Sequence, residues 1–240
     1  MSLYQRSREF IDYLERFEAG LPDLVLADFA AEVGGPERVA IIAVDLVRGF
    51  AKEGALASPR VNAILPAVVR TLGLAEAVGI RQVALVQDTH PPDAAEFDQF
   101  PEHCVAGSGE DHTVPELQEF FAGSTMHPRV IEKNSLSAIW APDFVAWHEE
   151  QIESGVEGYI VLGDCTDLCV VNVAVPLKTQ ANQHHRALRL VLPADCLATY
   201  DLPVATAEAA GAMPHDGDLL QAVFLYYLAL TGCEVVSRLV

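Results

Sequence analysis

Cysteine and basic residues are both scarce in this sequence of 240 residues. The five cysteines are odd in number and no two are spaced as Cys-x-x-Cys, which argues against a disulfide framework or a cysteine-based zinc knot. Lys and Arg number 15 against 34 Asp and Glu, so the formal net charge is −19. Because phosphate recognition relies on clustered basic side chains, we expect neither a nucleic-acid partner nor an anionic membrane partner. The acidity most simply confers solubility.

Long hydrophobic runs are missing as well. No apolar stretch approaches the roughly 18 residues needed to span a bilayer. Residues 1–20 mix charges throughout and lack the apolar core of a signal peptide. These absences predict a cytoplasmic protein.

The apolar content, 51% of the residues, is enough to bury the core of one α/β domain with an added extension. We predict a helical extension at residues 1–37 and a main domain at residues 38–240. The extension should pack on the domain or on a partner subunit, because four apolar residues share one helical face. These residues are Phe10, Ile11, Leu14 and Phe17.

Short, continuous apolar runs recur along the main domain, and they are rich in Val and Ile, as is typical of strands buried on both faces. Segments of helical character separate them, such as the one that ends at Gly79. This alternation predicts an α/β fold with three layers: a mostly parallel six-stranded sheet with helices on both faces. The runs lie at residues 39–46, 82–88, 129–133, 159–164, 188–196 and 233–237.

Polar residues end four of these runs: Asp45, Asp88, Asp164 and Lys133. In open α/β sheets the ligand crevice lies beyond the carboxyl ends of the strands, so chemistry is expected there. Each acid taken alone could equally cap the helix that follows it.

Cys169 is a candidate nucleophile because GDCTDLCVVNV (163–173) reads as a strand, a tight turn and the start of a helix. Free backbone N–H groups and the helix dipole would stabilise a thiolate there. Lowering a thiol pKa from about 8.5 to about 7 takes roughly 2 kcal/mol, which the helix terminus and Lys133 could supply. Asp45 could accept the thiol proton. A buried, inert cysteine is the competing interpretation, and Pro176 is expected to kink or end the helix.

A second cluster lies in QDTHPPDAAEFDQFPEHC (87–104), where Asp88 and His90 are two residues apart and so face the same way in an extended chain. Glu96 and His103 follow in a Pro-rich loop that could fold them back. Two imidazoles and two carboxylates suit zinc, manganese or iron(II), although a polar surface loop would have the same composition. Whether His215 approaches the site is left open.

Taken together, four motifs resemble the nicotinamidase branch of the isochorismatase-like cysteine hydrolases over residues 38–240. They are VDLVRGF (44–50), DTHPPDAAEF with FPEHCVAGS (88–108), IEKNSLSA (131–138) and GDCTDLCV (163–170). The resemblance implies a catalytic triad of Asp45, Lys133 and Cys169. It also implies a metal bound by Asp88, His90 and His103, with Glu96 where many members have a histidine; zinc is expected, with manganese or iron as alternatives.

The resemblance further implies how the substrate is held. The backbone N–H groups of Cys165 and Cys169 would form an oxyanion hole next to a cis peptide bond at Asp164–Cys165. Phe50 and Phe100 would sandwich the pyridine ring of nicotinamide.

The expected reaction is hydrolysis of nicotinamide to nicotinate and ammonia through a cysteine thioester, as in NAD salvage, by a homo-oligomeric protein that also accepts pyrazinamide. Two alternatives remain. One is a related amidohydrolase acting on a carbamoyl or ureido substrate, and the other is a non-catalytic binding protein with this fold.

Overall fold

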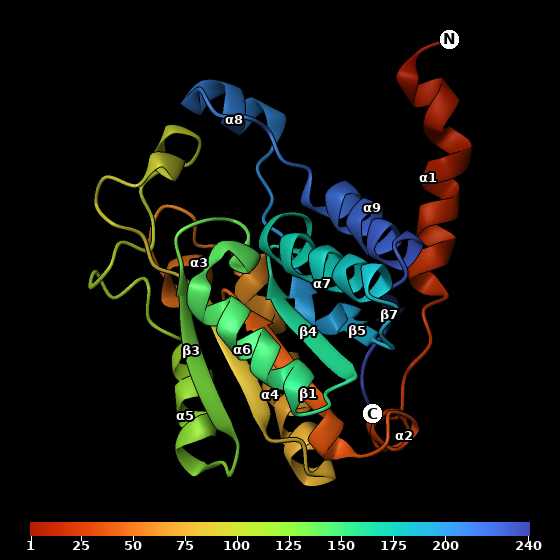
Figure 1. Ribbon diagram of the computed structural model, residues 1–240. Coiled ribbons are helices and arrows are strands. Elements are labelled where there is room, and N and C mark those ends of the chain that lie inside the picture. Colours follow the sequence, from red (N-terminus) through yellow and green to blue (C-terminus); the bar gives the residue numbers. More distant parts are fainter.

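The computed structural model describes residues 1–240 and is built around one sheet of seven parallel strands (Figure 1). Six strands follow the order β3-β2-β1-β4-β5-β7, and the two-residue β6 pairs with the end of β4. The strands are β1 (Val39–Val44), β2 (Gln82–Asp88), β3 (His127–Lys133), β4 (Gly158–Asp164), β5 (Arg189–Pro193), β6 (Leu197–Ala198) and β7 (Glu234–Val236).

The central strands are buried on both faces, as their unbroken apolar sequences predict. Every residue of β1 and β4 is buried, and so is every residue of β2 after Gln82. The predicted α/β fold with a mostly parallel sheet is confirmed. One predicted run differs: residues 188–196 do not form a single strand, because the chain leaves the sheet at Pro193 and returns as β6.

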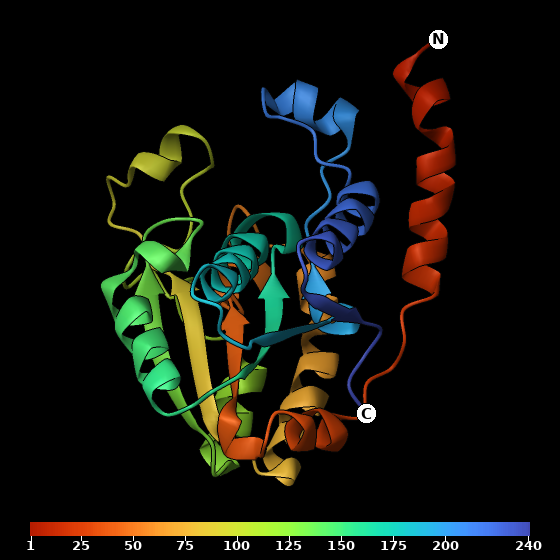
Figure 2. The ribbon, with the colours of Figure 1, turned by 45° about the vertical axis from the view of Figure 1, so that its right-hand side comes forward.

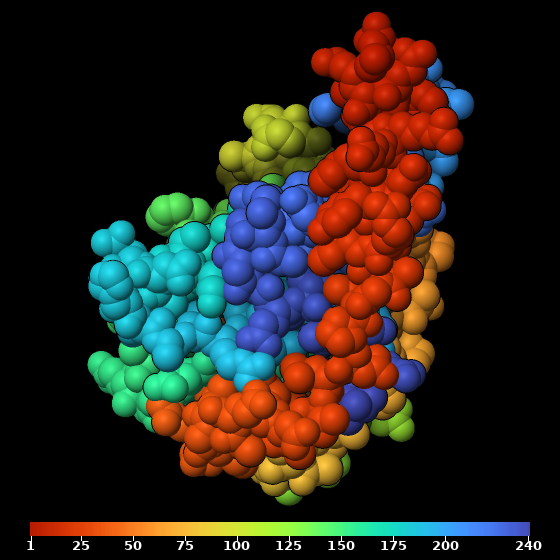
Figure 3. Space-filling view, turned by 90° about the vertical axis from the view of Figure 1, so that its right-hand side faces the viewer, coloured from red at the N-terminus to blue at the C-terminus, as the bar shows by residue number.

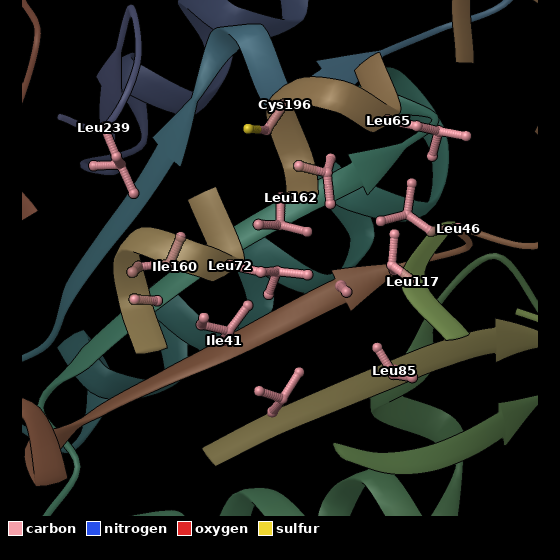
Figure 4. Close-up of a cluster of buried hydrophobic side chains, with 14 of the residues drawn as sticks. Ile41, Leu46, Leu65, Leu72, Leu85, Leu117, Ile160, Leu162, Cys196 and Leu239 are labelled. Carbon is pink, nitrogen blue, oxygen red and sulfur yellow. The ribbon is translucent and has the colours of Figure 1, made fainter. Parts of the chain in front are cut away.

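Helices cover both faces of the sheet and complete three layers (Figures 1 and 2). Leu65 and Leu72 of α4, with Leu117 of α5, pack against β1, β2 and β4 on one face (Figure 4). Helices α6, α7 and α9 cover the other face. The helices are α1 (Leu3–Ala19), α2 (Leu26–Glu32), α3 (Arg48–Ala51), α4 (Pro59–Val78), α5 (Pro115–Gly123), α6 (Pro142–Glu153), α7 (Val171–Gln183), α8 (Val204–Ala210) and α9 (Gly217–Leu230).

Helix α4 ends at the predicted glycine stop. Gly79 follows it with φ of 106°, and its N–H donates to the carbonyl groups of Ala75 and Glu76. By length and mean hydropathy alone α4 could cross a membrane. In the structure it is a core helix instead, because residues such as Leu65 and Leu72 are fully buried against the sheet.

Helix α1 runs along the outside of the molecule against α9 (Figures 2 and 3). Phe10 and Phe17 present their rings edge-on to Tyr226 of α9, at 5.3 and 5.9 Å between ring centroids, and Leu14 is buried. The predicted apolar face therefore packs on the body of the chain. The amino-terminal end of α1 projects beyond that body, and Tyr4 is 72% exposed.

Two excursions stand at the carboxyl end of the sheet, to which the arrows of β1 and β4 point (Figure 2). One is the loop that follows β2, residues 89–114, and the other carries α8. The two segments stand on opposite sides of the sheet edge at which the predicted site residues lie.

Candidate active site

The three residues of the predicted triad come together at the carboxyl edge of the sheet. Asp45 directly follows β1, and Lys133 is the last residue of β3, paired in register with Asp88 of β2. Cys169 lies in a wide helical turn, Thr166–Val170, that follows β4 and leads directly into α7. Because β1, β2 and β3 are neighbours, their ends deliver these side chains to one place. Cys169 is thus close to a helix amino terminus, as the sequence predicts.

Lys133 is the hub of this group. Its ammonium Nζ lies 2.9 Å from Asp45 Oδ2, forms a short ion pair with Asp88, and is 3.6 Å from Cys169 Sγ. All four side chains are buried. Burial lowers the pKa of Lys133, but Asp45 and Asp88 more than reverse that effect, and the net pKa lies well above its ordinary value. Lys133 therefore carries a positive charge beside the sulfur.

The Asp45 carboxylate is held in place by the backbone. The N–H of Asp88 donates to Asp45 Oδ1 at 2.9 Å, which leaves Oδ2 toward Lys133. Burial, and then the nearby charge of Asp88, raise the pKa of Asp45 from 3.8 to about 6 despite the opposing effect of Lys133. A carboxylate with a raised pKa is a stronger base, which suits a group that receives a thiol proton.

The ionisation of Cys169 differs from the sequence expectation. Burial raises the pKa of the thiol well above its ordinary value, and the ammonium of Lys133 offsets only part of that rise. The expected lowering of this pKa is therefore wrong for the resting state, because the sequence does not report how completely the sulfur is removed from water. The resting group is a thiol whose proton must leave during the reaction.

Asp164, the third acid predicted at a strand end, is also fully buried. Burial, followed by the charges of Asp45 and Asp88, holds the pKa of Asp164 well above its usual range. This environment favours the protonated, uncharged form of the Asp164 carboxyl group. The peptide bond between Asp164 and Cys165 is cis, as the resemblance implies. The oxyanion hole expected from the N–H groups of Cys165 and Cys169 stays a prediction.

The four predicted metal ligands form a compact group next to the triad. One donor atom from each of Asp88, His90, Glu96 and His103 lies within 4.8 Å of the others. His90 Nε2 is 3.6 Å from Asp88 Oδ1, and His103 Nε2 is 3.9 Å from Asp88 Oδ2. The Pro-rich loop thus folds Glu96 and His103 back onto the end of β2.

Backbone pairing produces this fold-back. The N–H of His90 donates to the carbonyl of Cys104, and the N–H of Ala106 donates to the carbonyl of His90, both at 2.9 Å. These two bonds fix the chain on either side of the loop, so His103 is brought next to His90 by the main chain itself.

The orientation of both histidines suits a cation. His103 Nδ1 lies 2.7 Å from the carbonyl oxygen of Pro101, which can only accept, so Nδ1 carries the proton and Nε2 has the free lone pair. His90 Nδ1 likewise faces Asn134 Oδ1 at 2.7 Å. His90 Nε2 and Glu96 Oε1 are buried without any hydrogen-bond partner. Unpaired buried acceptors are costly, and a divalent cation would satisfy both.

Aromatic side chains surround His103. Phe50 and Phe100, the predicted substrate-binding pair, lie 5.6 and 6.3 Å from its ring between centroids. Their sandwiching of a substrate ring stays a prediction. Phe97 was not predicted; it contacts His90 at 5.4 Å and His103 at 5.6 Å. Its position directly after Glu96 is the only signal that the sequence offers.

His215 lies near the Thr166–Val170 turn that carries Cys169. The sequence leaves the relation of His215 to the site open. His215 Nε2 is 2.7 Å from an oxygen of Asp167, two residues before Cys169. No spacing rule pairs residues 48 positions apart, so this contact had no signal in the sequence.

The fold and the site together define a class of protein. Residues 39–215, more than half of the chain, match the profile of the isochorismatase domain. The chain therefore belongs to the isochorismatase family.

Both curated proteins and solved structures include proteins similar to this chain. Among curated proteins, nicotinamidase 1 of Arabidopsis thaliana is 29% identical over 216 residues, which cover 84% of this chain and 86% of that protein. A nicotinamidase structure from Bacillus subtilis matches with TM-score 0.66 and 21% identity, covering 83% of this chain and 99% of that chain. N-carbamoylsarcosine amidase from Thermoplasma acidophilum matches with TM-score 0.58 and 20% identity, covering 82% and 95%. At such identities the two structures establish a shared fold alone.

Proposed function

We propose that this protein is a metal-dependent nicotinamidase that hydrolyses nicotinamide to nicotinate and ammonia. The observation that carries the proposal is the sharing of Asp88 between two groups. Its carboxylate pairs with Lys133 beside Cys169 and also lies within the cluster of candidate metal ligands. The thiol, the carboxylate base and the ammonium can act on an amide group, and the adjacent cation site can bind a ring nitrogen that has a lone pair. A substrate with an amide attached to such a ring therefore fits both groups. The similarity to a curated nicotinamidase supports this substrate.

Asp88, His90, Glu96 and His103 would hold one divalent transition metal ion, with zinc expected and manganese or iron as alternatives. The chemistry that such an ion supplies is Lewis-acid binding of the pyridine nitrogen, directly or through water, which orients the ring. Phe50 and Phe100, whose rings both lie near that of His103, would then hold the faces of the substrate ring.

The first half of the reaction forms a thioester. Asp45 accepts the thiol proton as the sulfur of Cys169 attacks the carboxamide carbon, and Lys133 stabilises the negative charge on the sulfur. The backbone N–H groups at Cys165 and Cys169 would stabilise the oxyanion. Asp45 returns its proton to the leaving nitrogen, so ammonia departs and the C–N bond is replaced by a C–S bond.

The second half restores the enzyme. Asp45, again ionised, removes a proton from a water molecule that attacks the thioester carbon. The C–S bond breaks, the sulfur recovers the proton from Asp45, and nicotinate leaves. The product is the one that NAD salvage uses. The range of amides, pyrazinamide among them, and the homo-oligomeric state stay predictions.

The test is ammonia release from nicotinamide by the purified protein, before and after treatment with a chelator. We expect release that chelation lowers and added zinc, manganese or iron(II) restores. Cys169→Ala should abolish release while keeping the metal content. Cys233→Ala serves as the matched control, because this buried cysteine lies between α9 and β7, away from the carboxyl ends of the strands, and should leave the rate unchanged.

Three outcomes would contradict the proposal. Full activity of Cys169→Ala would remove the nucleophile. No release with any of the three metals, but release of ammonia from a carbamoyl or ureido compound, would move the protein to the related amidohydrolases. Absence of both reactions would favour a non-catalytic binding protein.

A further inference from the structure

His215 occupies a fixed and buried position although it belongs to a loop. It precedes α9, is 8% exposed, and pairs with Leu202 through two backbone hydrogen bonds of 2.7 and 2.9 Å. Its ring stacks on Tyr200 at 3.8 Å between centroids, with 21° between the planes. Stacking and backbone pairing together fix the direction in which the imidazole nitrogens point.

Asp167 forms a hydrogen bond with one of these nitrogens. Because Asp167 belongs to the Thr166–Val170 turn, this bond connects His215 to the segment that carries Cys169. Asp167 Oδ2 lies 2.7 Å from His215 Nε2, and Asp167 Oδ1 accepts a hydrogen bond from the buried hydroxyl of Thr199. Both carboxylate oxygens are therefore engaged by segments outside the turn. Asp167 stands midway between Cys165 and Cys169, so it links the turn to the chain around Thr199 and His215.

The same turn is also held from within. The carbonyl oxygen of Cys165 accepts from the N–H groups of Leu168 and Val170, each at 3.1 Å. These bonds set the curvature of the turn, but they do not fix its position against the rest of the site. The bonds of Asp167 provide that second restraint.

Both ring nitrogens of His215 have a hydrogen-bond partner. Its Nδ1 lies 2.9 Å from the carbonyl oxygen of Tyr200, and its Nε2 faces a carboxylate. Both ring nitrogens are therefore engaged, one by the main chain and one by the carboxylate of Asp167. Two such contacts hold the ring and the carboxylate in a fixed relation, which suits a rigid support.

We propose that His215 is a positioning residue of the active site, acting through Asp167 on the turn that carries Cys169. It is not proposed to touch the substrate. The inference rests on the proposed function, since it assumes that Cys169 is the nucleophile. A small displacement of a reacting group can lower a rate by about 100-fold, so loosening this support should slow attack by the sulfur.

The test compares His215→Phe with His215→Gln. Phe keeps a ring to stack on Tyr200 but donates no hydrogen bond, whereas the amide of Gln can still donate to Asp167. His148→Gln is the matched control, because His148 is also a buried histidine with two hydrogen bonds, but to Tyr159 and Gln180. For each variant we would measure kcat and KM for nicotinamide, the rate of Cys169 alkylation by iodoacetamide located by mass spectrometry, and the free energy of unfolding.

We expect His215→Phe to lower kcat and the alkylation rate by about 10- to 100-fold, with KM changed by less than about twofold. His215→Gln should recover a large part of both rates, and His148→Gln should keep them. Wild-type kcat and alkylation rates in both His215 variants would overturn the inference. So would losses in His148→Gln equal to those in His215→Phe at equal stability, because the effect would then be general.

Alkylation separates this inference from the proposed substrate. If the wild type releases no ammonia from nicotinamide but Cys169 is alkylated and the His215 effect remains, the substrate is wrong and the inference stands. If the folded wild type shows neither alkylation of Cys169 nor ammonia release from any of the amides tested, the nucleophile and the inference both fail.

Discussion

The hydroxyl of Ser137 donates a hydrogen bond of 2.8 Å to the carbonyl oxygen of Asn172. In a regular helix that carbonyl would accept from the N–H of the residue four positions later, which here is Pro176 and has no N–H. A side chain from the segment after β3 thus satisfies the acceptor that the proline leaves free. Helix α7 continues past Pro176 to Gln183, so the expected end of the helix at this proline is wrong.

Removing this hydroxyl should therefore be costly only while the proline is present. Ser137→Ala should lower the free energy of unfolding by about 1 kcal/mol, because the carbonyl loses its donor. In a Pro176→Ala background the new N–H of residue 176 can serve the same carbonyl, and Ser137→Ala should then cost much less. Urea unfolding of the four proteins measures the coupling. Equal losses in both backgrounds would show that the hydroxyl does not compensate for the proline.

Lys133→Met should destabilise the fold as well as stop catalysis. The substitution keeps the length of the side chain but leaves the buried Asp45 and Asp88 carboxylates without their shared cation. Loss of one member of a buried ion pair costs about 3–5 kcal/mol. Adding Asp45→Asn removes one of the stranded charges, so the double variant should be more stable than Lys133→Met alone. A double variant less stable than the single one would contradict this account.

Glu96→Ala should weaken metal binding by about tenfold or more, because removal of even an outer partner of a ligand costs that much. The buried Oε1 of Glu96 has no hydrogen-bond partner in the protein. Glu102→Ala is the control, since it removes the same charge from an exposed position in the same loop. Metal content after dialysis against a graded chelator gives the comparison. Identical retention by both variants would remove Glu96 from the ligand set.

His148 should make stability depend on pH. Burial lowers the pKa of His148 in the folded protein, although its bond to Gln180 opposes that shift. The unfolded chain therefore binds the proton first as the pH falls below about 6.5. Stability should decline from that pH downward until the folded form also takes up the proton.

His148→Gln can keep both hydrogen bonds but does not titrate, so this part of the decline should disappear. Urea unfolding between pH 5 and 8 measures it, with the exposed His184→Gln as the control. An unchanged slope in His148→Gln would assign the decline to other groups.

The sheet is predictable from the sequence because β1, β2 and β4 are buried on both faces, which imposes unbroken apolar runs. The break between β5 and β6 is not predictable, since residues 188–196 are mostly apolar and Pro193 can end a strand or stand at an edge. In α7 the carbonyl that Pro176 leaves without a backbone donor is bonded by Ser137, which lies 39 positions before the proline. Such compensation is set by tertiary contacts and is invisible to local rules.

The site is predictable as far as its residues lie in short motifs at strand ends. Asp45, Asp88 and Lys133 converge because neighbouring parallel strands end at one edge, whereas the loop after β2 brings the other three candidate ligands to the same place. The ionisation of Cys169 could not be predicted, because burial outweighs the nearby ammonium and burial is a property of the folded chain. The contact of His215 with Asp167 also needed the structure, since it joins two segments through a loop of irregular course.

The backbone pairing of Leu202 with His215 has a practical consequence for protein engineering. It closes residues 203–214 at their base, and all of these residues except Ala207 of α8 are exposed. The entropy of closing such a segment grows only slowly with its length. A reporter peptide or a whole folded domain spliced in near Gly211 would hang outside the sheet, leaving the anchored ends, and the chemistry beside them, where they were.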